Sequence, residues 1–106
     1  MLKTLLVPLL LVAATGPTFA AIDRATAVTT LARLFNSAEF CNLSISRAKV
    51  QAYQVANTPA DDALFNVDVF RATHDLSTQQ KSWTKEQTAT YCKTAVETAK
   101  TLDMGL

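Results

Sequence analysis

Glycine is almost absent from this chain, which has only two glycines, Gly16 and Gly105, in 106 residues. Proline is nearly as rare, and after residue 20 it occurs only at Pro59. Tight hairpin turns and the loops that cradle phosphates both depend on glycine. The sequence therefore disfavours a β-rich fold and a glycine-rich nucleotide-binding loop, and it predicts an all-α fold.

The first twenty residues have the pattern of a cleavable signal peptide. Lys3 precedes the apolar run LLVPLLLVAA at residues 5–14, which is too short to span a bilayer. Thr18 and Ala20 are small enough for signal peptidase at positions −3 and −1, so we expect cleavage after Ala20. A lipid anchor would need a cysteine at position 21, where alanine stands. The expected product, residues 21–106, is one small periplasmic or secreted domain without stable membrane insertion.

The charge of this product excludes one class of partner. The chain has ten basic and nine acidic residues, and the loss of Lys3 leaves the two kinds in equal number. The basic residues are scattered singly, so they form no positive patch for nucleic acid or for an anionic membrane surface. We therefore expect no nucleic-acid partner.

The product contains two cysteines, Cys41 and Cys92, and the leader sends it to an oxidising compartment. A disulfide between them is the expected state. A catalytic or metal-binding thiol would need a base or another ligand close by, and neither cysteine has one in sequence. Cys92 also belongs to the apolar face of an expected C-terminal helix, where Cys41 can meet it. That face consists of Cys92, Ala95, Val96, Ala99 and Leu102.

Four helices are expected in residues 21–106, as a small orthogonal or bundle-like domain. The first starts after the N-cap Asp23 and runs to about Cys41, and the second starts after Ser44 and closes near Asn57. The residues expected to be buried are Val28, Leu31, Leu34, Phe35 and Ala38 in the first helix, and Ile45, Ala48, Ala52 and Val55 in the second.

The third helix is expected to begin at Thr58 as N-cap, with Pro59 in the first helical position. Its two apolar stripes predict that it is covered on both sides. After a polar connector over residues 76–83, Thr84 and Gln87 predict a capping box for the last helix, which Gly105 is placed to stop. The stripes of the third helix are Ala63, Val67 and Phe70, and Phe65, Val69, Ala72 and Leu76.

No residue pattern predicts catalysis or a metal site. His74 is the only histidine, and no carboxylate at helical spacing orients its ring. No second histidine stands four residues away to form a zinc pair. Asp61 and Asp62 are adjacent, so they diverge on a helix, and the helix dipole accounts for both. We expect no catalytic residue, no metal ligand and no cofactor, and His74 has no predicted role.

Trp83 is the most informative single residue for partner binding. It lies between Lys81 and Lys85 in the polar connector, and tryptophan is enriched at binding hot spots. Its alternative role is to cover the end of the helical core. Two further motifs say less about function. Asn42-Leu43-Ser44 matches the acceptor pattern for N-glycosylation, which matters only in a eukaryotic source. A row of threonines borders the apolar face of the last helix, at Thr90, Thr94, Thr98 and Thr101.

These observations predict a small exported, non-enzymatic protein that acts through contact with another protein, such as a chaperone, an inhibitor or an immunity-type partner. In outline the chain is similar to the small periplasmic acid-stress chaperones, a likeness of architecture without a shared motif. The alternative is a carrier of a small apolar ligand held between the helices. It rests on more aromatic residues than a core rich in alanine needs, namely Phe35, Phe40, Phe65, Phe70 and Tyr91.

Overall fold

A computed structural model of the chain describes residues 22–106, where the regular structure consists of four α-helices and no strand. The all-α prediction is therefore confirmed. The predicted signal peptide, residues 1–20, lies outside the described residues. The helices are α1 (Arg24–Phe40), α2 (Arg47–Asn57), α3 (Phe65–Gln80) and α4 (Lys85–Thr101).

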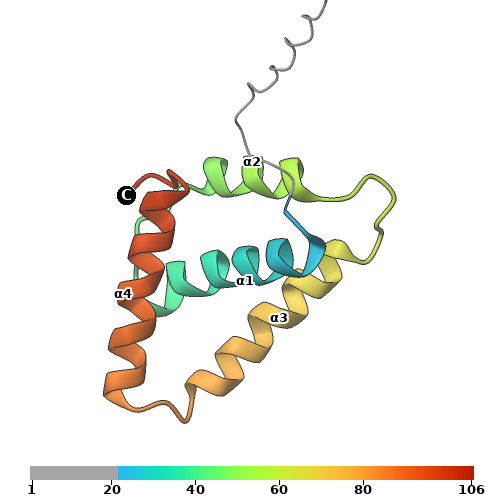
Figure 1. Cartoon of the computed structure of the whole chain (residues 1–106). Coiled ribbons are helices and arrows are strands. Elements are labelled where there is room, and N and C mark those ends of the chain that lie inside the picture. Colours follow the sequence, from blue (N-terminus) through green and yellow to red (C-terminus); the bar gives the residue numbers. More distant parts are fainter. Residues whose placement is uncertain (1–21) are drawn as a thin grey trace, which may run out of the picture.

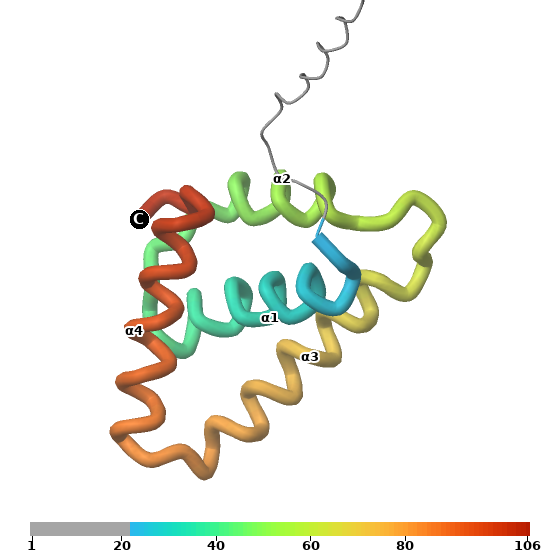
Figure 2. Tube along the Cα trace, viewed as in Figure 1, coloured from blue at the N-terminus to red at the C-terminus, as the bar shows by residue number. Residues whose placement is uncertain are grey.

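Helix α1 lies at the centre of the fold, and the other three helices pack against it (Figure 1). Figure 2 shows α2 and α3 running along different sides of α1, while α4 crosses near its C-terminal end. Because α1 is covered from several directions, even the small residues Ala27, Ala32 and Ser37 are buried. The hydrophobic core consists of Ala27, Leu31, Leu34, Val50, Tyr53, Phe65, Val69, Ala99 and Met104.

The boundaries of α1 follow the local sequence. The carboxylate of Asp23 accepts a hydrogen bond of 2.9 Å from the backbone N–H of Thr26, which caps the helix and lowers the pKa of Asp23. At the other end Asn42 adopts a left-handed conformation (φ 55°), and the N–H of Leu43 donates to the carbonyl of Ala38 at 3.1 Å. The predicted extent of this helix is confirmed, and Leu31 and Leu34 are buried, whereas Val28 and Ala38 are only partly buried and Phe35 is 37% exposed.

The predicted buried face of α2 is wrong. The helix begins after Ser46, whose hydroxyl accepts a hydrogen bond from the backbone N–H of Lys49, and not after Ser44. Val50 and Tyr53 are buried, whereas Val55 is 77% exposed. The predicted Ala48 and Ala52 are exposed as well, and Ile45, before the helix, is partly buried. A short helix with few large apolar residues allows more than one face, and packing against α1 selects the one that carries Tyr53.

The predicted start of α3 is also wrong. Thr58 ends α2, because its hydroxyl donates to the carbonyl of Gln54 at 2.6 Å and its backbone is extended, as is usual before proline. Turns follow, and α3 begins only at Phe65. Within the turns Asp62 forms an ion pair with Arg24 at the start of α1, and hydrogen bonding to this guanidinium lowers the pKa of Asp62. A tertiary ion pair thus competes with the local helix signal.

One side of α3 is buried and the other is not, so the prediction that both are covered is wrong. Phe65 and Val69 are buried, while Val67 and Phe70 are 45% and 75% exposed. The helix also continues to Gln80 through most of the predicted polar connector, because Gln80 is buried against α1.

Helix α4 agrees with its prediction at the N-terminus and along its apolar face. The capping box between Thr84 and Gln87 is present, and Ala95 and Ala99 are buried. The helix ends differently from the prediction, because Asp103 takes the left-handed position (φ 57°) two residues before Gly105. Buried Met104 then accepts a hydrogen bond of 2.7 Å from the N–H of Ser46, which joins the C-terminal segment to the start of α2.

Candidate functional site

The predicted disulfide is present. Cys41, directly after α1, is bonded to Cys92 in α4, with their Cα atoms 5.6 Å apart and a sequence separation of 51. The bond joins the C-terminal end of the central helix to the last helix. Neither cysteine is free.

Trp83 lies beside this disulfide in a cluster of three aromatic rings. Its ring centroid is 5.9 Å from that of Phe40 and 5.1 Å from that of Tyr91, and both contacts are edge-to-face. Such pairs are typically worth about 0.5 to 1.5 kcal/mol beyond their buried area. Trp83 is partly buried. It therefore packs within the aromatic cluster and leaves part of the indole exposed, and its predicted binding role stays a prediction.

A buried polar cluster joins α1, α3 and α4, and the sequence did not predict it. Asn36 and Gln80 exchange two side-chain hydrogen bonds of 3.0 and 2.7 Å, and the Tyr91 hydroxyl donates to the Asn36 carbonyl oxygen at 2.7 Å. Burial raises the pKa of Tyr91, while the charge of Arg33 and a hydrogen bond with Gln80 act in the opposite direction. Every buried side-chain polar atom among residues 22–106 has a partner. The only sign of this cluster in the sequence is the pair of amide side chains, Asn36 and Gln80.

Replacing Asn36 with alanine is expected to lower the free energy of unfolding by about 1 to 3 kcal/mol, because the Gln80 amide and the Tyr91 hydroxyl lose their buried partner. Urea denaturation followed by circular dichroism measures the change. Thr88→Ala is the control, since Thr88 is outside the cluster. A loss for Asn36→Ala no larger than that of the control would show that water replaces the missing amide without cost.

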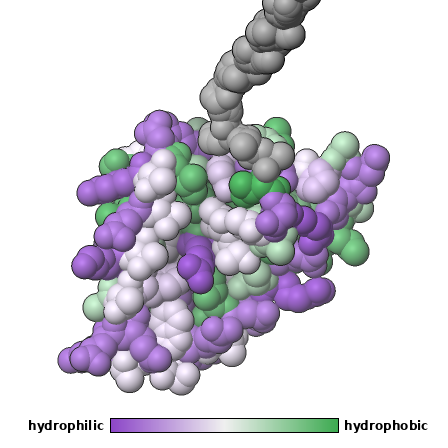
Figure 3. All heavy atoms as spheres, in the orientation of Figure 1, coloured by the Kyte–Doolittle hydropathy of each residue, from purple (hydrophilic) through white to green (hydrophobic). Residues whose placement is uncertain are grey.

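Three exposed apolar side chains form a stripe along α3 and the residue that precedes it. Leu64 is 62% exposed, and Val67 and Phe70 follow at intervals of three residues. Large apolar side chains exposed in a row are a mark of interaction surfaces on soluble proteins. Figure 3 shows hydrophobic groups on the side of the molecule where α2 leads into α3, within a largely hydrophilic surface. We call these three residues the α3 stripe.

A groove of about 300 Å³ is lined by residues of α1, α2 and α3 and by Ile45. Phe70 is one turn before Thr73, which lies in the α3 wall of the groove. The charged side chains of Glu39 and Arg47 border an otherwise apolar lining. We call it the α1–α3 groove, and its other lining residues are Leu34, Phe35, Ala38, Ile45, Val50 and Thr73.

The other candidate residues in the sequence do not form a site in the structure. His74 is exposed on α3, and Asp61 is exposed in the turns before it. Residues 22–106 contain no group of three side chains suited to hold a metal ion. Within the same residues no helix has the length and apolar character needed to cross a membrane. Asn42 is exposed at the end of α1.

The fold is thus a four-helix, disulfide-linked domain with an apolar stripe and groove on one side. Comparison with models of protein families, with curated proteins and with solved structures gave no match. The function is therefore argued from the surface of this chain alone.

Proposed function

We propose that this protein is a small exported binding protein that acts by contact with another protein, and that the α3 stripe is its main contact surface. The observation that carries the proposal is the exposure of Leu64, Val67 and Phe70 on one helix. Burial of apolar area contributes roughly 25 cal/mol per Å², so leaving these side chains in water gives up stabilisation that a partner could recover. Together with Trp83 they would form the apolar anchors that dominate protein interfaces.

Export is part of the proposal. The disulfide between Cys41 and Cys92 is consistent with an oxidising compartment, since disulfides persist in the periplasm and outside the cell. The leader pattern in residues 1–20 points to the same location. Binding without catalysis is proposed because the single histidine and the carboxylates form no acid–base arrangement in the sequence.

The double variant Val67→Ser/Phe70→Ser is expected to keep the stability of the native protein and to lose partner capture by at least tenfold. Phe70 is 75% exposed and Val67 45% exposed, so the two replacements together lower the free energy of unfolding by no more than about 1 kcal/mol. The measurement is affinity capture from the source organism's exported fraction, with quantitative mass spectrometry of the captured proteins.

Val55→Ser is the matched control, because Val55 is an equally exposed apolar residue on a different helix. The proposal requires at least one protein that the native chain and Val55→Ser capture and the double variant does not. Capture that is the same for all three chains would refute the stripe as a binding surface. A parallel capture with Trp83→Ala, corrected for its stability, tests the predicted second anchor.

The α1–α3 groove favours a second candidate function, a carrier of a small apolar ligand. Its volume of about 300 Å³ is at the lower end of the range for ligand pockets, and most of its lining is apolar. Native mass spectrometry of protein purified from its source distinguishes the two functions. A bound small molecule that is lost in Phe35→Ser favours the carrier, and a bare mass favours protein contact.

A further inference from the structure

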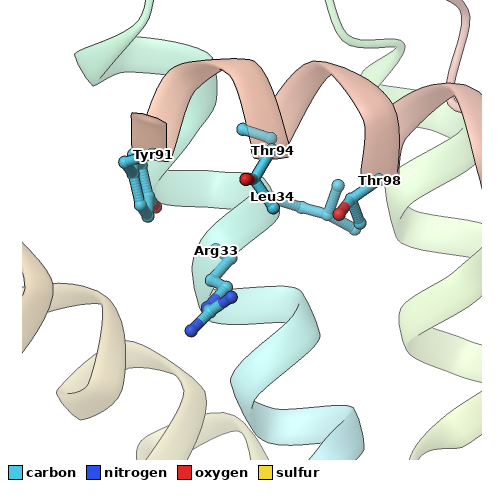
Figure 4. A pocket seen from close by; sticks show the side chains of 6 residues that line it. Arg33, Leu34, Tyr91, Thr94 and Thr98 are labelled. Atoms are coloured by element: carbon cyan, nitrogen blue, oxygen red, sulfur yellow. The ribbon is translucent and has the colours of Figure 1, made fainter. Parts of the chain in front are cut away.

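A second, smaller pocket opens between α1 and α4, away from the α3 stripe. Its volume is about 120 Å³. Residues 33 and 35 point to different sides of α1, so Arg33 faces this pocket while Phe35 faces the α1–α3 groove. Figure 4 shows Thr94 and Thr98 of α4 projecting toward Leu34 of α1, whereas the side chain of Arg33 extends along α1 with its guanidinium directed away from α4. We call it the α1–α4 pocket, and its lining residues are Arg33, Leu34, Tyr91, Thr94, Ala95 and Thr98.

The lining combines an apolar floor with free hydroxyl groups. Leu34 and Ala95 are 2% and 8% exposed, so they present carbon atoms at the base of the pocket. Thr94 and Thr98 are one helical turn apart, and in Figure 4 their hydroxyl oxygens lie on the side of α4 that faces α1. Neither hydroxyl makes a hydrogen bond within the described residues, whereas the hydroxyl of Tyr91 is already bound to Asn36.

Arg33 brings a positive charge that no described carboxylate neutralises. The ion pairs within residues 22–106 involve other basic side chains. Its neighbours one turn away on α1 are Thr29, Thr30, Asn36 and Ser37, none of which is acidic. On α4, Glu97 borders an adjoining hollow and makes no ion pair with Arg33. The charge of Arg33 nevertheless acts on the Tyr91 side of the pocket, where it opposes the effect of burial on the pKa.

We propose that the α1–α4 pocket binds a carboxylate attached to a short apolar tail. The exposed guanidinium of Arg33 would turn toward α4 to pair with the carboxylate, the hydroxyls of Thr94 and Thr98 would donate to it, and the tail would lie against Leu34 and Ala95. Guanidinium groups suit carboxylates because their planar donors match the two oxygens. This site is separate from the surface proposed for protein contact.

The size of the pocket limits the tail. At the roughly 30 Å³ that one water occupies in the liquid, a volume of about 120 Å³ holds about four heavy atoms. Propionate, which has three carbon and two oxygen atoms, is close to this size. The same group is present at the end of a glutamate side chain, so the carboxylate could belong to a free short-chain acid or to a glutamate of a partner protein.

Titration with sodium propionate, followed by ¹H–¹⁵N correlation spectra, tests the site. The backbone signals of Thr94, Ala95 and Thr98 are expected to shift in a saturable way, with a dissociation constant on the order of 1 mM for so small a ligand. Sodium chloride at equal ionic strength and propionamide, which keeps the tail but lacks the charge, should give no saturable shift. Arg33→Gln is expected to weaken propionate binding at least tenfold, and Thr94→Val several-fold.

Arg47→Gln serves as the control, since it removes an arginine of similar setting from the α1–α3 groove. A parallel titration with doubly blocked glutamate separates the two sources. Tighter binding of propionate assigns the pocket to a free acid, and tighter binding of blocked glutamate assigns it to a partner's side chain. Absence of saturable shifts with both probes, or binding that Arg33→Gln and Arg47→Gln weaken equally, would overturn the proposal.

Discussion

Replacing both Cys41 and Cys92 with serine is expected to lower the free energy of unfolding by about 4 kcal/mol. The disulfide closes a loop with a sequence separation of 51, and the chain-entropy model assigns roughly this amount to a loop of that length. Domains of this size are stabilised by only about 5 to 15 kcal/mol in total. The double variant should therefore be marginally folded near 37 °C.

Denaturant unfolding of the native and double-variant chains, without reductant, measures this effect. Native protein treated with dithiothreitol should unfold at the same denaturant concentration as the double variant, and the variant itself should not respond to dithiothreitol. A loss below about 1 kcal/mol would mean that the helices hold together without the bond, contrary to the chain-entropy argument.

The second large effect is expected at Phe65. This ring is completely buried at the start of α3, and the Arg24 guanidinium lies 5.7 Å from its centroid on the solvent side. Phe65→Ala should lower the free energy of unfolding by about 3 to 5 kcal/mol, because it leaves a large cavity against α1. Thermal or urea unfolding measures the loss.

The chain provides its own control for this variant. Phe70 is on the same helix and is 75% exposed, so Phe70→Ala should change the stability by less than about 0.5 kcal/mol. Equal losses for the two alanine variants would mean that the exposed face of α3 is covered in solution, as it would be in an assembly of this chain.

Both variants test how α1 is held in place by neighbouring helices that carry little apolar surface. Helix α1 provides packing for all three other helices, and the disulfide fixes its C-terminal end to α4. The polar cluster of Asn36, Gln80 and Tyr91 adds a specific contact among α1, α3 and α4. The outer face of α3 takes no part in these contacts, and Val67 and Phe70 on it are exposed.

The candidate site could be predicted only in part. Trp83 was singled out from sequence, and the structure places it in an aromatic cluster beside the predicted disulfide. The α3 stripe was missed, because Val67 and Phe70 occur at the spacing of a core stripe and were expected to be buried. Sequence periodicity shows that residues share a face, but it does not show whether another element covers that face.

The local features of this protein follow from its amino-acid sequence. The scarcity of glycine predicted the all-α fold, Asp23 and the Thr84–Gln87 capping box set two helix starts, and the two cysteines defined the disulfide. Each depends on residues near in sequence or on a chemical necessity such as thiol pairing.

The start of α3 and the buried faces of α2 and α3 depend on the tertiary structure. It moved the start of α3 from Thr58 to Phe65, because Asp62 binds Arg24 of α1 and Thr58 closes α2. It selected Tyr53 over Val55 as the buried side of α2 and left Phe70 in water. These outcomes depend on which helices meet, and packing between distant segments outweighs local preferences that differ by less than about 1 kcal/mol per residue.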